Sequence, residues 1–218
     1  MPKTAILLGA TGATGSELLK LLLNDNRYDT IKLFSRKASG VSHPKVKEYV
    51  IDLFALEQHA TDFTGDVVFC CIGTTKAKTP DTDTYYKIDY GIPVAAAALA
   101  ALNGIRSCIV ISALGADKNS GIFYNRTKGQ MQEAVLEQGI SNTHLLQPAL
   151  IVADRPENRL GEKIASAVFK LINPILIGSM KKYRSIAVLT IARAMIWLDN
   201  NSYPKIIVPS DEIQELGR

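Results

Sequence analysis

The stretch Gly9-Ala10-Thr11-Gly12-Ala13-Thr14-Gly15 decides the fold of this chain. An apolar run, residues 5–8, precedes it, and leucines at helical spacing follow it in residues 18–23. Strand, glycine turn and helix in this order are typical of a dinucleotide-binding unit, because glycine allows a tight turn and a close approach to the pyrophosphate. The phosphates then meet backbone N–H groups at the positive end of the helix. We therefore assign cofactor binding to Gly9, Thr11, Gly12, Ala13, Thr14 and Gly15; an ordinary loop with turn glycines is the alternative.

Apolar runs of strand length recur along the chain, at residues 4–9, 30–35, 46–51, 66–73, 107–112 and 143–146. Helical patterns separate most of them, and this alternation predicts an α/β fold of the Rossmann type: a doubly wound parallel sheet with helices on both faces. Residues 85–103 predict one long helix. Its alanine-rich face is expected to pack against the sheet or against a second copy in a homodimer.

Size and composition favour one folded domain over residues 1–218, since 47% of the residues are hydrophobic. From about residue 152 the pattern becomes irregular, with helices expected around residues 164–171 and 188–198. We expect this small C-terminal portion, about 152–218, to cover the pocket and select the substrate. The longest apolar stretch, residues 164–177, is too short to cross a bilayer. No cleavable leader is evident at the start, which predicts a cytoplasmic protein.

Charge, cysteines and histidines argue against several other functions. The net charge is +4, and no basic run alternates with stacking aromatics, so we expect no nucleic-acid binding. The three cysteines lie in apolar strand patterns without C-x-x-C spacing, which predicts buried, reduced thiols: Cys70, Cys71 and Cys108. The three histidines are isolated in the sequence, so we predict no metal site: His43, His59 and His144.

The end of the second expected strand indicates which dinucleotide binds. A carboxylate near this position usually accepts the ribose 2′-hydroxyl of NAD, whereas an arginine accommodates a 2′-phosphate. Here the residues are Ser35, Arg36 and Lys37, which predicts NADP(H), because a guanidinium can bind the phosphate bidentately. A solvated strand end is the alternative. Asp52, with Leu53 beside it, closes the third strand and would accept a bond from adenine or cap the next helix.

Two further strand ends are assigned to the cofactor. Cys71, Gly73 and Thr74 follow the fourth strand, where glycine would let the backbone approach the ribose. Pro148 follows the sixth strand near the expected nicotinamide, although proline also simply ends strands. Lys76, in the loop after the fourth strand, has no assigned role.

The candidate catalytic residues are Ser112, Tyr124 and Lys128, and we assign Tyr124 and Lys128 to cofactor binding as well. Ser112 ends the fifth strand, and Tyr124 and Lys128 share one face of the next helix because they are four residues apart. A nearby ammonium and an oxidised nicotinamide would favour the phenolate, so that Tyr124 could exchange a proton with a substrate oxygen. Ser112 would hold that oxygen by a hydrogen bond. The alternative is a chance pair, with the tyrosine packed and the lysine solvated.

These motifs resemble the atypical branch of the short-chain dehydrogenase/reductase superfamily. Gly9-x-x-Gly12-x-x-Gly15 and Tyr124-x-x-x-Lys128 with Ser112 are similar to its cofactor and active-site patterns. The chain is more similar still to the NADPH-binding proteins related to the HIV Tat-interacting protein. The stretches that carry this similarity are Cys70-Cys71-Ile72-Gly73-Thr74-Thr75-Lys76, Ser112-Ala113-Leu114-Gly115-Ala116-Asp117-Lys118, Lys128-Gly129 and Asp154-Arg155-Pro156-Glu157-Asn158-Arg159.

The resemblance implies a Rossmann fold, NADP(H) bound by Gly9, Gly12, Gly15 and Arg36, and a retained set of Ser112, Tyr124 and Lys128. It implies no particular substrate, and animal members of the group are discussed as regulators. The chain departs from the pattern at two places. Ala113 stands where the group tends to carry a second serine. The asparagine of the superfamily's proton relay has no secure counterpart; Asp89 is the nearest candidate, or merely orients its loop.

Three functions remain open on the sequence. The first is an NADPH-dependent reductase that acts on a small carbonyl compound or a quinone. The second is a sensor that binds NADP(H) and changes its hold on a regulatory protein partner without turnover. The third and weaker is a nucleotide-sugar epimerase, whose substrate domain is generally larger than the 67 residues that follow Ile151 here.

Overall fold

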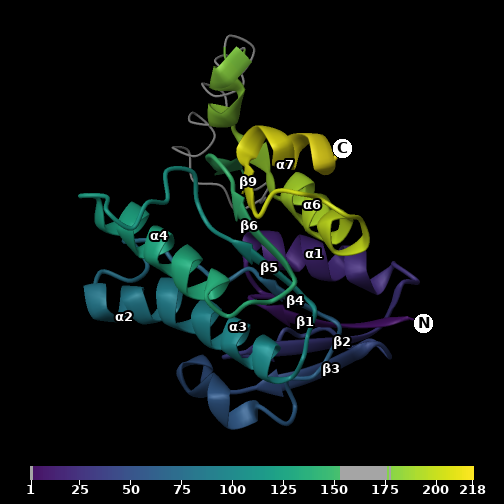
Figure 1. Cartoon of the computed structure of the whole chain (residues 1–218). Coiled ribbons are helices and arrows are strands. Elements are labelled where there is room, and N and C mark those ends of the chain that lie inside the picture. Colours follow the sequence, from purple (N-terminus) through teal and green to yellow (C-terminus); the bar gives the residue numbers. More distant parts are fainter. Residues whose placement is uncertain (1, 153–175, 177) are drawn as a thin grey trace.

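A computed structural model describes residues 2–152, 176 and 178–218 of the chain. Its centre is a sheet of seven strands in the order β3-β2-β1-β4-β5-β6-β9, and every neighbouring pair is parallel (Figure 1). The strands are β1 (Lys3–Leu8), β2 (Tyr28–Ser35), β3 (Val46–Val50), β4 (Val67–Cys70), β5 (Ser107–Ile111), β6 (Asn142–Gln147) and β9 (Ile207–Pro209). The predicted Rossmann fold is confirmed. β9 is an addition that the sequence pattern did not reveal.

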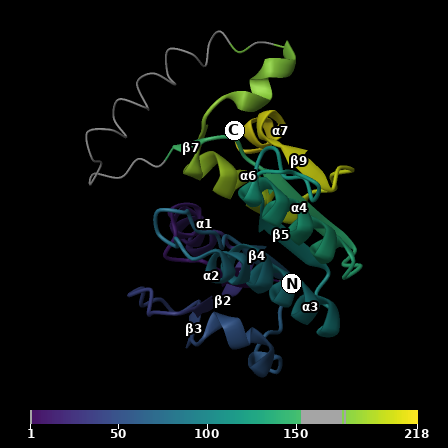
Figure 2. The same cartoon turned by 90° about the vertical axis from the view of Figure 1, so that its left-hand side faces the viewer.

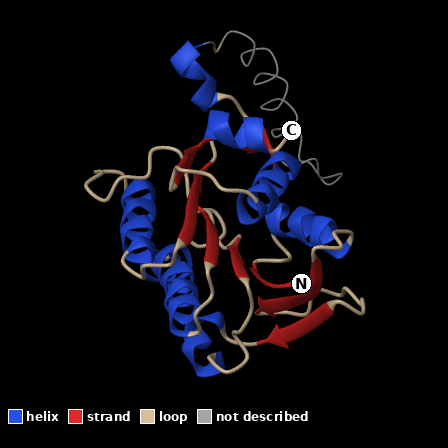
Figure 3. Cartoon of the chain, turned by 45° about the vertical axis from the view of Figure 1, so that its right-hand side comes forward, coloured by secondary structure: helices blue, strands red, loops and turns tan. Residues whose placement is uncertain are grey.

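Helices cover both faces of the sheet, as predicted (Figure 3). One face carries α1 (Ala13–Leu23), α6 (Val188–Asn200) and α7 (Ser210–Leu216). The other carries the layer that faces the viewer in Figure 2: α2 (Thr82–Tyr86), α3 (Ile92–Leu102) and α4 (Phe123–Leu136), with a short 3₁₀ segment, η1 (Leu53–His59).

The strands divide their side chains between these two layers. In β1, Leu7 belongs to the same hydrophobic cluster as Leu18 of α1, whereas Leu8 belongs to the cluster of Ala96 of α3 on the opposite face. Successive strand residues point to opposite faces, so a strand covered on both sides must be apolar at every position. This explains the unbroken apolar runs of the central strands. The alanine-rich face of α3 lies against the sheet, the first of the two predicted arrangements; the homodimer stays a prediction.

The order of the strands determines where a ligand can bind. β1 lies between β2 and β4, and the last residue of β1, Leu8, pairs with Phe34 of β2 and Cys70 of β4. Cys70 in turn pairs with Val110 of β5. From β1 the chain runs outward to β2 and β3 on one side of the sheet. It then returns to the other side of β1, where β4, β5 and β6 follow in order. This reversal opens a crevice at the carboxyl ends of the strands, where doubly wound proteins bind their ligands.

The predicted helix over residues 85–103 is interrupted by a π-helical segment. α2 continues through η2 (Lys87–Gly91) into α3, with right-handed helical backbone angles where η2 begins and ends. A π turn adds one residue to the helical repeat and is common at functional sites. Asp89 lies in this turn and is 1% exposed. Gly91 ends the turn and Pro93 follows it, and these two residues of low helix propensity mark the interruption in the sequence.

The C-terminal part of the chain completes the sheet and one helix layer. A second, two-stranded parallel sheet joins β7 (Ile151–Val152) to β8 (Ile186–Ala187), after a 3₁₀ segment, η4 (Gly178–Tyr183). The helix predicted around residues 188–198 is confirmed as α6, which packs along α1. The helix predicted around residues 164–171 lies outside the described residues. The single domain and the covering role of residues 152–218 stay predictions.

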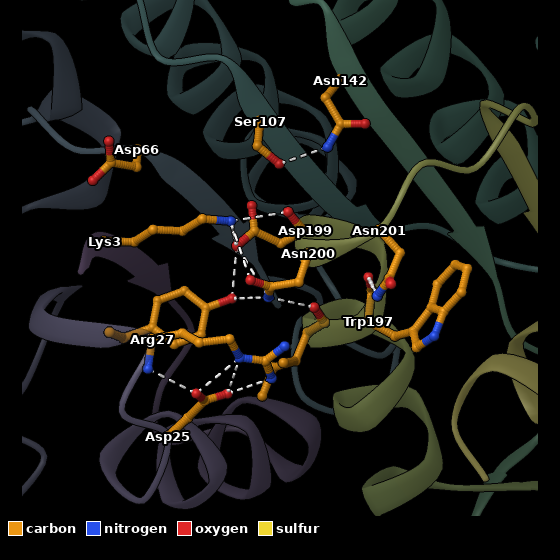
Figure 4. Close-up of polar contacts among 12 residues, drawn as sticks. Lys3, Asp25, Arg27, Asp66, Ser107, Asn142, Trp197, Asp199, Asn200 and Asn201 are labelled. Atoms are coloured by element: carbon orange, nitrogen blue, oxygen red, sulfur yellow. Dashed lines mark hydrogen bonds and ion pairs between the residues drawn. The ribbon is translucent and has the colours of Figure 1, made fainter. Parts of the chain in front are cut away.

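A polar network at the amino ends of the strands ties the start of β1 to the end of α6 (Figure 4). The Lys3 ammonium lies 2.9 Å from Asp199 Oδ2 and 3.2 Å from Asn200 Oδ1. The buried Tyr28 hydroxyl donates to the same Asp199 oxygen at 2.6 Å and accepts from Asn200 Nδ2 at 2.7 Å. Burial, and then the charge of Asp199, raise the pKa of Tyr28 above its usual range. Each polar group in this network therefore has a partner.

Candidate active site

A cleft of about 490 Å³ opens at the carboxyl edge of the sheet, between the first turn of α1 and the first turns of α4. Most of the predicted catalytic and nucleotide-binding residues line it: Thr11, Gly12, Ala13, Thr14, Cys71, Gly73, Thr74, Ser112, Tyr124 and Lys128. It is also lined by Asp89, the candidate for the relay position, and by residues to which the sequence pattern assigned no site: Ile72, Thr75, Lys78, Ile111 and Ile151. The structure thus brings the glycine turn and the three candidate catalytic residues to one cavity.

The glycine turn is shaped by two glycines that lie behind the cleft. Gly9 has a φ of +85°, and a Cβ there would lie 2.7 Å from the carbonyl oxygen of Cys71. A Cβ on Gly15 would lie 2.0 Å from the carbonyl oxygen of Gly9, so a side chain would push α1 off the strand. Gly12 N donates to Gly9 O at 2.9 Å and closes the turn. These are the close approaches that the glycine pattern predicted.

The start of α1 suits a phosphate. Gly12 is the N-cap of α1, no side chain caps the helix, and its first turn holds no acidic residue. The first N–H groups of a helix have no partner within it and carry its positive end. Thr11, Ala13 and Thr14 stand at this end on the cleft wall. The residues present therefore fit the pyrophosphate of a dinucleotide.

The predicted 2′-phosphate site lies outside the cleft wall. Ser35 is buried, and its hydroxyl donates to the carbonyl oxygen of Lys37 at 2.8 Å, so it shapes the turn after β2. Arg36 and Lys37 are exposed. Within residues 2–152, 176 and 178–218 neither side chain forms a hydrogen bond or an ion pair. Among the described residues, no acidic side chain therefore competes with a phosphate for the Arg36 guanidinium.

The remaining cofactor predictions fall on residues with structural partners. Asp52 accepts a hydrogen bond from Phe54 N at 2.9 Å and caps η1, which is the second of its two predicted roles. Leu53 is buried in the core beneath η1. The carbonyl oxygen of Pro148 accepts from Leu114 N at 3.0 Å. None of the three lines the cleft, and their contacts with a cofactor stay predictions.

Lys128 is buried and forms an ion pair with Asp89. Its Nζ lies 2.9 Å from Asp89 Oδ1, and the two side chains are 4% and 1% exposed. The other carboxylate oxygen, Oδ2, accepts from Thr74 N at 2.8 Å. The Tyr85 hydroxyl donates to Thr74 O at 3.2 Å and holds the same loop. A solvated Lys128 is therefore excluded. Asp89 orients the loop through Thr74 N, and its ion pair compensates the charge of Lys128.

Ser112 is held by a residue that the sequence analysis missed. Gln132 Nε2 donates to Ser112 Oγ at 2.6 Å, and both side chains are buried. Gln132 Oε1 accepts from Gln147 Nε2 at 3.4 Å. Gln132 lies four residues after Lys128 and eight after Tyr124, so the same helical spacing that linked those two could have identified it.

Tyr124 lies in the first turn of α4 and is 38% exposed. Burial, and then the charge of Asp89, raise its pKa to about 12. The expected effect of the Lys128 ammonium together with an oxidised nicotinamide concerns the cofactor-bound site and stays a prediction. Asp89, which contributes to this shift, is also the partner of Lys128 in the ion pair described above.

The other reactive side chains near the cleft have ordinary partners. Lys76 Nζ donates to Pro80 O at 2.6 Å and lies over the ring of Phe123, so no role in the site is assigned to it. Cys70 and Cys71 are free thiols, and burial raises the pKa of Cys70 to about 11. In the described part of the chain no three His, Cys, Asp or Glu side chains gather as a metal site would require.

A parallel sheet with this strand order and a glycine turn at its switch point defines a Rossmann dinucleotide-binding protein. In agreement, the model of an NAD(P)H-binding family matches residues 9–151. The rat protein HTATIP2 is 32% identical over 198 residues, which cover 89% of this chain and 80% of that protein. The mitochondrial protein fmp52 of Aspergillus niger is 32% identical over 179 residues, covering 79% of this chain and 76% of its own. The chain belongs to this NAD(P)H-binding family, an atypical branch of the short-chain dehydrogenases/reductases.

Solved structures share the fold at low sequence identity. The Bordetella bronchiseptica enzyme WbmH, solved with NAD⁺, aligns with a TM-score of 0.70 at 14% identity, over 95% of this chain and 75% of its own. UDP-glucose 4-epimerase from Thermotoga maritima aligns with a TM-score of 0.65 at 16% identity. The alignment covers 89% of this chain and 72% of the epimerase chain. These alignments establish the fold alone. Among the described residues no helix is long and apolar enough to cross a membrane.

Proposed function

We propose that the protein is an NADP(H)-dependent reductase that transfers hydride to a small carbonyl compound or a quinone, with Tyr124 as the proton donor. One observation carries the proposal: Ser112, Tyr124 and Lys128 line the same cleft as the glycine turn and the first turn of α1. In a carbonyl reduction, the hydride donor and the proton donor must both reach the same carbonyl group. The cleft is lined by residues that would hold the cofactor and by residues that would donate the proton.

The cofactor would lie across the β1 and β4 ends. Thr11, Gly12 and Ala13 would hold its pyrophosphate through backbone N–H groups. Arg36 would bind the 2′-phosphate of NADP(H), which its exposed and unpaired guanidinium can reach from the end of β2. When bound, the reduced cofactor supplies the hydride.

The chain's own residues would act on the substrate oxygen. Ser112 Oγ already accepts a hydrogen bond from Gln132, so its own proton is available to donate to that oxygen as negative charge develops. The Tyr124 phenol is protonated at neutral pH and would transfer its proton to the same oxygen. Ile111 and Ile151 line the cleft and contribute apolar surface to the substrate side.

A titration calorimetry experiment with NADPH and NADH tests the cofactor half of this proposal. After removal of carried-over nucleotide, we expect wild-type protein to bind NADPH more tightly. Arg36→Ala should weaken NADPH binding by about tenfold or more and leave NADH unchanged, since one charged hydrogen-bonding group is lost. Lys47→Ala, which removes an exposed positive charge from the neighbouring strand β3, serves as a control. Equal weakening of both nucleotides would refute the assignment of Arg36.

A non-catalytic sensor remains the second candidate, because apolar side chains are exposed around the cleft. Ile122 is 63% exposed and Leu150 49%, and Ile151 extends this surface to the cleft wall. Such a rim suits a protein partner as well as a substrate. A sensor has no need of the Tyr124 hydroxyl, so Tyr124→Phe would leave its partner binding intact.

The cellular setting is a separate expectation. We retain the cytoplasmic location and the absence of nucleic-acid binding as predictions from the sequence. The fungal relative fmp52 is named mitochondrial, so the location needs its own measurement, by fractionation of cells that express the tagged protein.

A further inference from the structure

We propose that the protein has a second ligand site, separate from the cleft, which binds a small acid with one carboxylate and an apolar body. The site is a groove of about 480 Å³ formed by the end of α1, by α6 and by the end of α7. Its wall combines apolar side chains with Arg193, an arginine that has no ion pair among the described residues. The inference goes beyond the proposed reductase activity and does not depend on it.

The groove lies near the opposite end of α1 from the cleft. Ala13, the first residue of α1, lines the cleft, whereas Leu21, near the end of the helix, lines the groove. A helix rises about 1.5 Å per residue, so these two positions are about 12 Å apart along its axis. The two cavities share no lining residue. The volume of the groove suits a small molecule, and a ligand bound there would leave the cofactor cleft free.

Part of the groove wall is apolar. It consists of Leu21 of α1, Ile196 and Trp197 of α6, and Leu216 of α7. Leu21, Trp197 and Leu216 pack against the core but are only partly buried, so each leaves apolar surface at the groove. The indole ring of Trp197 meets the ring of Tyr203 edge-on, with centroids 5.9 Å apart, which restricts its orientation. A ligand with a hydrocarbon body would remove this apolar surface from water, which favours binding.

The charges on the wall favour an anion. Asp25, the acidic side chain of the wall, accepts hydrogen bonds from Arg27 Nε at 2.9 Å and from Arg27 Nη2 at 2.6 Å (Figure 4). These two charges compensate each other. Arg218, also on the wall, is the last residue of the chain. Arg193 projects from α6, is exposed, and forms no hydrogen bond or ion pair with any described residue. Its guanidinium is therefore a cation without a counter-ion beside apolar surface.

The end of α1 presents little opposing charge. The last carbonyl groups of a helix carry its negative end when they lack partners. Asn24 satisfies two of them, because its Nδ2 donates to Lys20 O at 2.8 Å and its backbone N donates to Leu21 O at 3.2 Å. Lys45 Nζ donates to Leu23 O at 3.0 Å and adds a positive charge there. An anion in the groove would thus meet bonded carbonyl groups.

The arrangement on α6 indicates the class of ligand. Arg193 and Trp197 are four residues apart and are therefore neighbours on one face of the helix. A guanidinium binds a carboxylate through two parallel N–H groups. With the carboxylate on Arg193, the body of the ligand would extend over the indole of Trp197. An aromatic ring joined to a carboxylate by a short chain has this form, and 4-phenylbutyrate is a suitable probe.

The protein supplies its own reporter for the test. Trp197 is the one tryptophan in the sequence, so its indole N–H gives a single signal in a ¹H–¹⁵N NMR spectrum. We expect 4-phenylbutyrate to shift this signal saturably, with a Kd of about 1 mM or lower. 4-Phenylbutanol, which lacks the charge, should bind at least about tenfold more weakly. Butyrate, which lacks the ring, should also bind at least about tenfold more weakly.

Variants on the groove wall test the role of each charge. Arg193→Gln should weaken binding of 4-phenylbutyrate by about tenfold or more, because a charged hydrogen-bonding group is lost. Arg106→Gln is the matched control and should bind as the wild type does: Arg106 is also exposed and unpaired among the described residues, but it lies outside the groove. Asp25→Asn frees the Arg27 guanidinium and should tighten binding by about threefold or more. Asparagine can still accept from Arg27 N, so the turn is retained.

The outcomes separate this site from the cleft. Saturating NADPH should leave the affinity for 4-phenylbutyrate unchanged. A Kd above about 10 mM, equal binding of 4-phenylbutanol, unchanged binding in Arg193→Gln or weaker binding in Asp25→Asn would overturn the inference. Loss of binding in the presence of NADPH would place the probe in the cleft and would also overturn it. The measurement needs neither cofactor nor turnover, so failure of the reductase proposal would leave this site unaffected.

Discussion

Each of the two edges of the sheet carries a lysine, an aspartate and a tyrosine, but the tyrosine has a hydrogen-bond partner at one edge and faces a cleft at the other. At the amino edge, Lys3, Tyr28 and Asp199 form a network in which the 2%-exposed carboxylate receives both the ammonium and the phenol (Figure 4). At the carboxyl edge, Asp89 and Lys128 pair in the same way, but Tyr124 forms no hydrogen bond within the described residues and faces a cleft. A saturated network contributes stability, whereas a tyrosine left without a partner beside a cavity is available to a ligand.

The largest difference between the two edges should appear on removing each phenolic hydroxyl. We expect Tyr124→Phe to lower kcat by about 10²–10⁴-fold, the usual contribution of a positioned acid, with the NADPH Kd unchanged. Tyr28→Phe is the matched control, because it removes the same group beside a carboxylate and a lysine at the opposite edge. It should retain full activity. Equal kinetic loss in both variants would contradict the assignment of Tyr124.

Removal of the amino-edge carboxylate should affect stability and not catalysis. Asp199→Ala leaves the buried Tyr28 hydroxyl without its acceptor and the Lys3 ammonium without its carboxylate, and we expect the free energy of unfolding to fall by about 2–4 kcal/mol. Lys3 is 31% exposed and regains water, which limits the loss. Urea unfolding followed by circular dichroism measures it. A large drop in kcat with unchanged stability would show that the amino edge takes part in the reaction.

We expect an intermediate effect on kcat from changing Gln132, which donates a hydrogen bond to Ser112. Gln132→Glu replaces a donor by an acceptor, which would take the Ser112 proton away from the substrate. We expect kcat to fall by about 10²-fold, as for loss of one oxyanion donor, with little change in KM. Gln132→Leu only removes the hydrogen bond to Ser112, so its kcat should fall less than that of Gln132→Glu. Steady-state kinetics of both variants beside Ser112→Ala test this order, and a wild-type kcat in Gln132→Glu would exclude it.

The smallest effect should be the stability change in Tyr28→Phe. Its hydroxyl bridges Asp199 and Asn200, and loss of one hydrogen-bonding group beside a charge costs about 1–2 kcal/mol. Tyr124→Phe should be neutral or slightly stabilising, since its hydroxyl bonds to no described residue. A melting-temperature comparison of the two variants checks this contrast. A greater loss for Tyr124→Phe would mean that its hydroxyl has a structural role.

Much of the fold was predictable because its signals are local. The glycine turn follows from φ at Gly9 and from the contact between Gly15 and Gly9, and six strands follow from apolar runs. β9 was not predictable, because Ile207–Pro209 is three residues long and contains a proline. Only the alignment of Leu145 with Ile207 makes it a strand.

The sequence predicted which residues form the site, but it did not predict how their charges are paired. The sequence placed Ser112, Tyr124 and Lys128 on one edge, and the structure brings all three to one cleft. The sequence could not reveal that Lys128 is paired with Asp89. Asp89 lies in the π turn of η2, and its ion pair with Lys128 depends on how η2 packs against α4, which the sequence does not specify.

The sequence by itself determined the class of fold, the glycine turn and the helical spacing of Tyr124 and Lys128. These depend on backbone sterics and on periodicity, which act over a few neighbouring residues. Only the tertiary structure decided which charges meet: Asp89 with Lys128, Gln132 with Ser112 and Asp199 with Tyr28. Such pairs depend on the packing of distant elements, and burial then determines how strongly each charge acts on its neighbour.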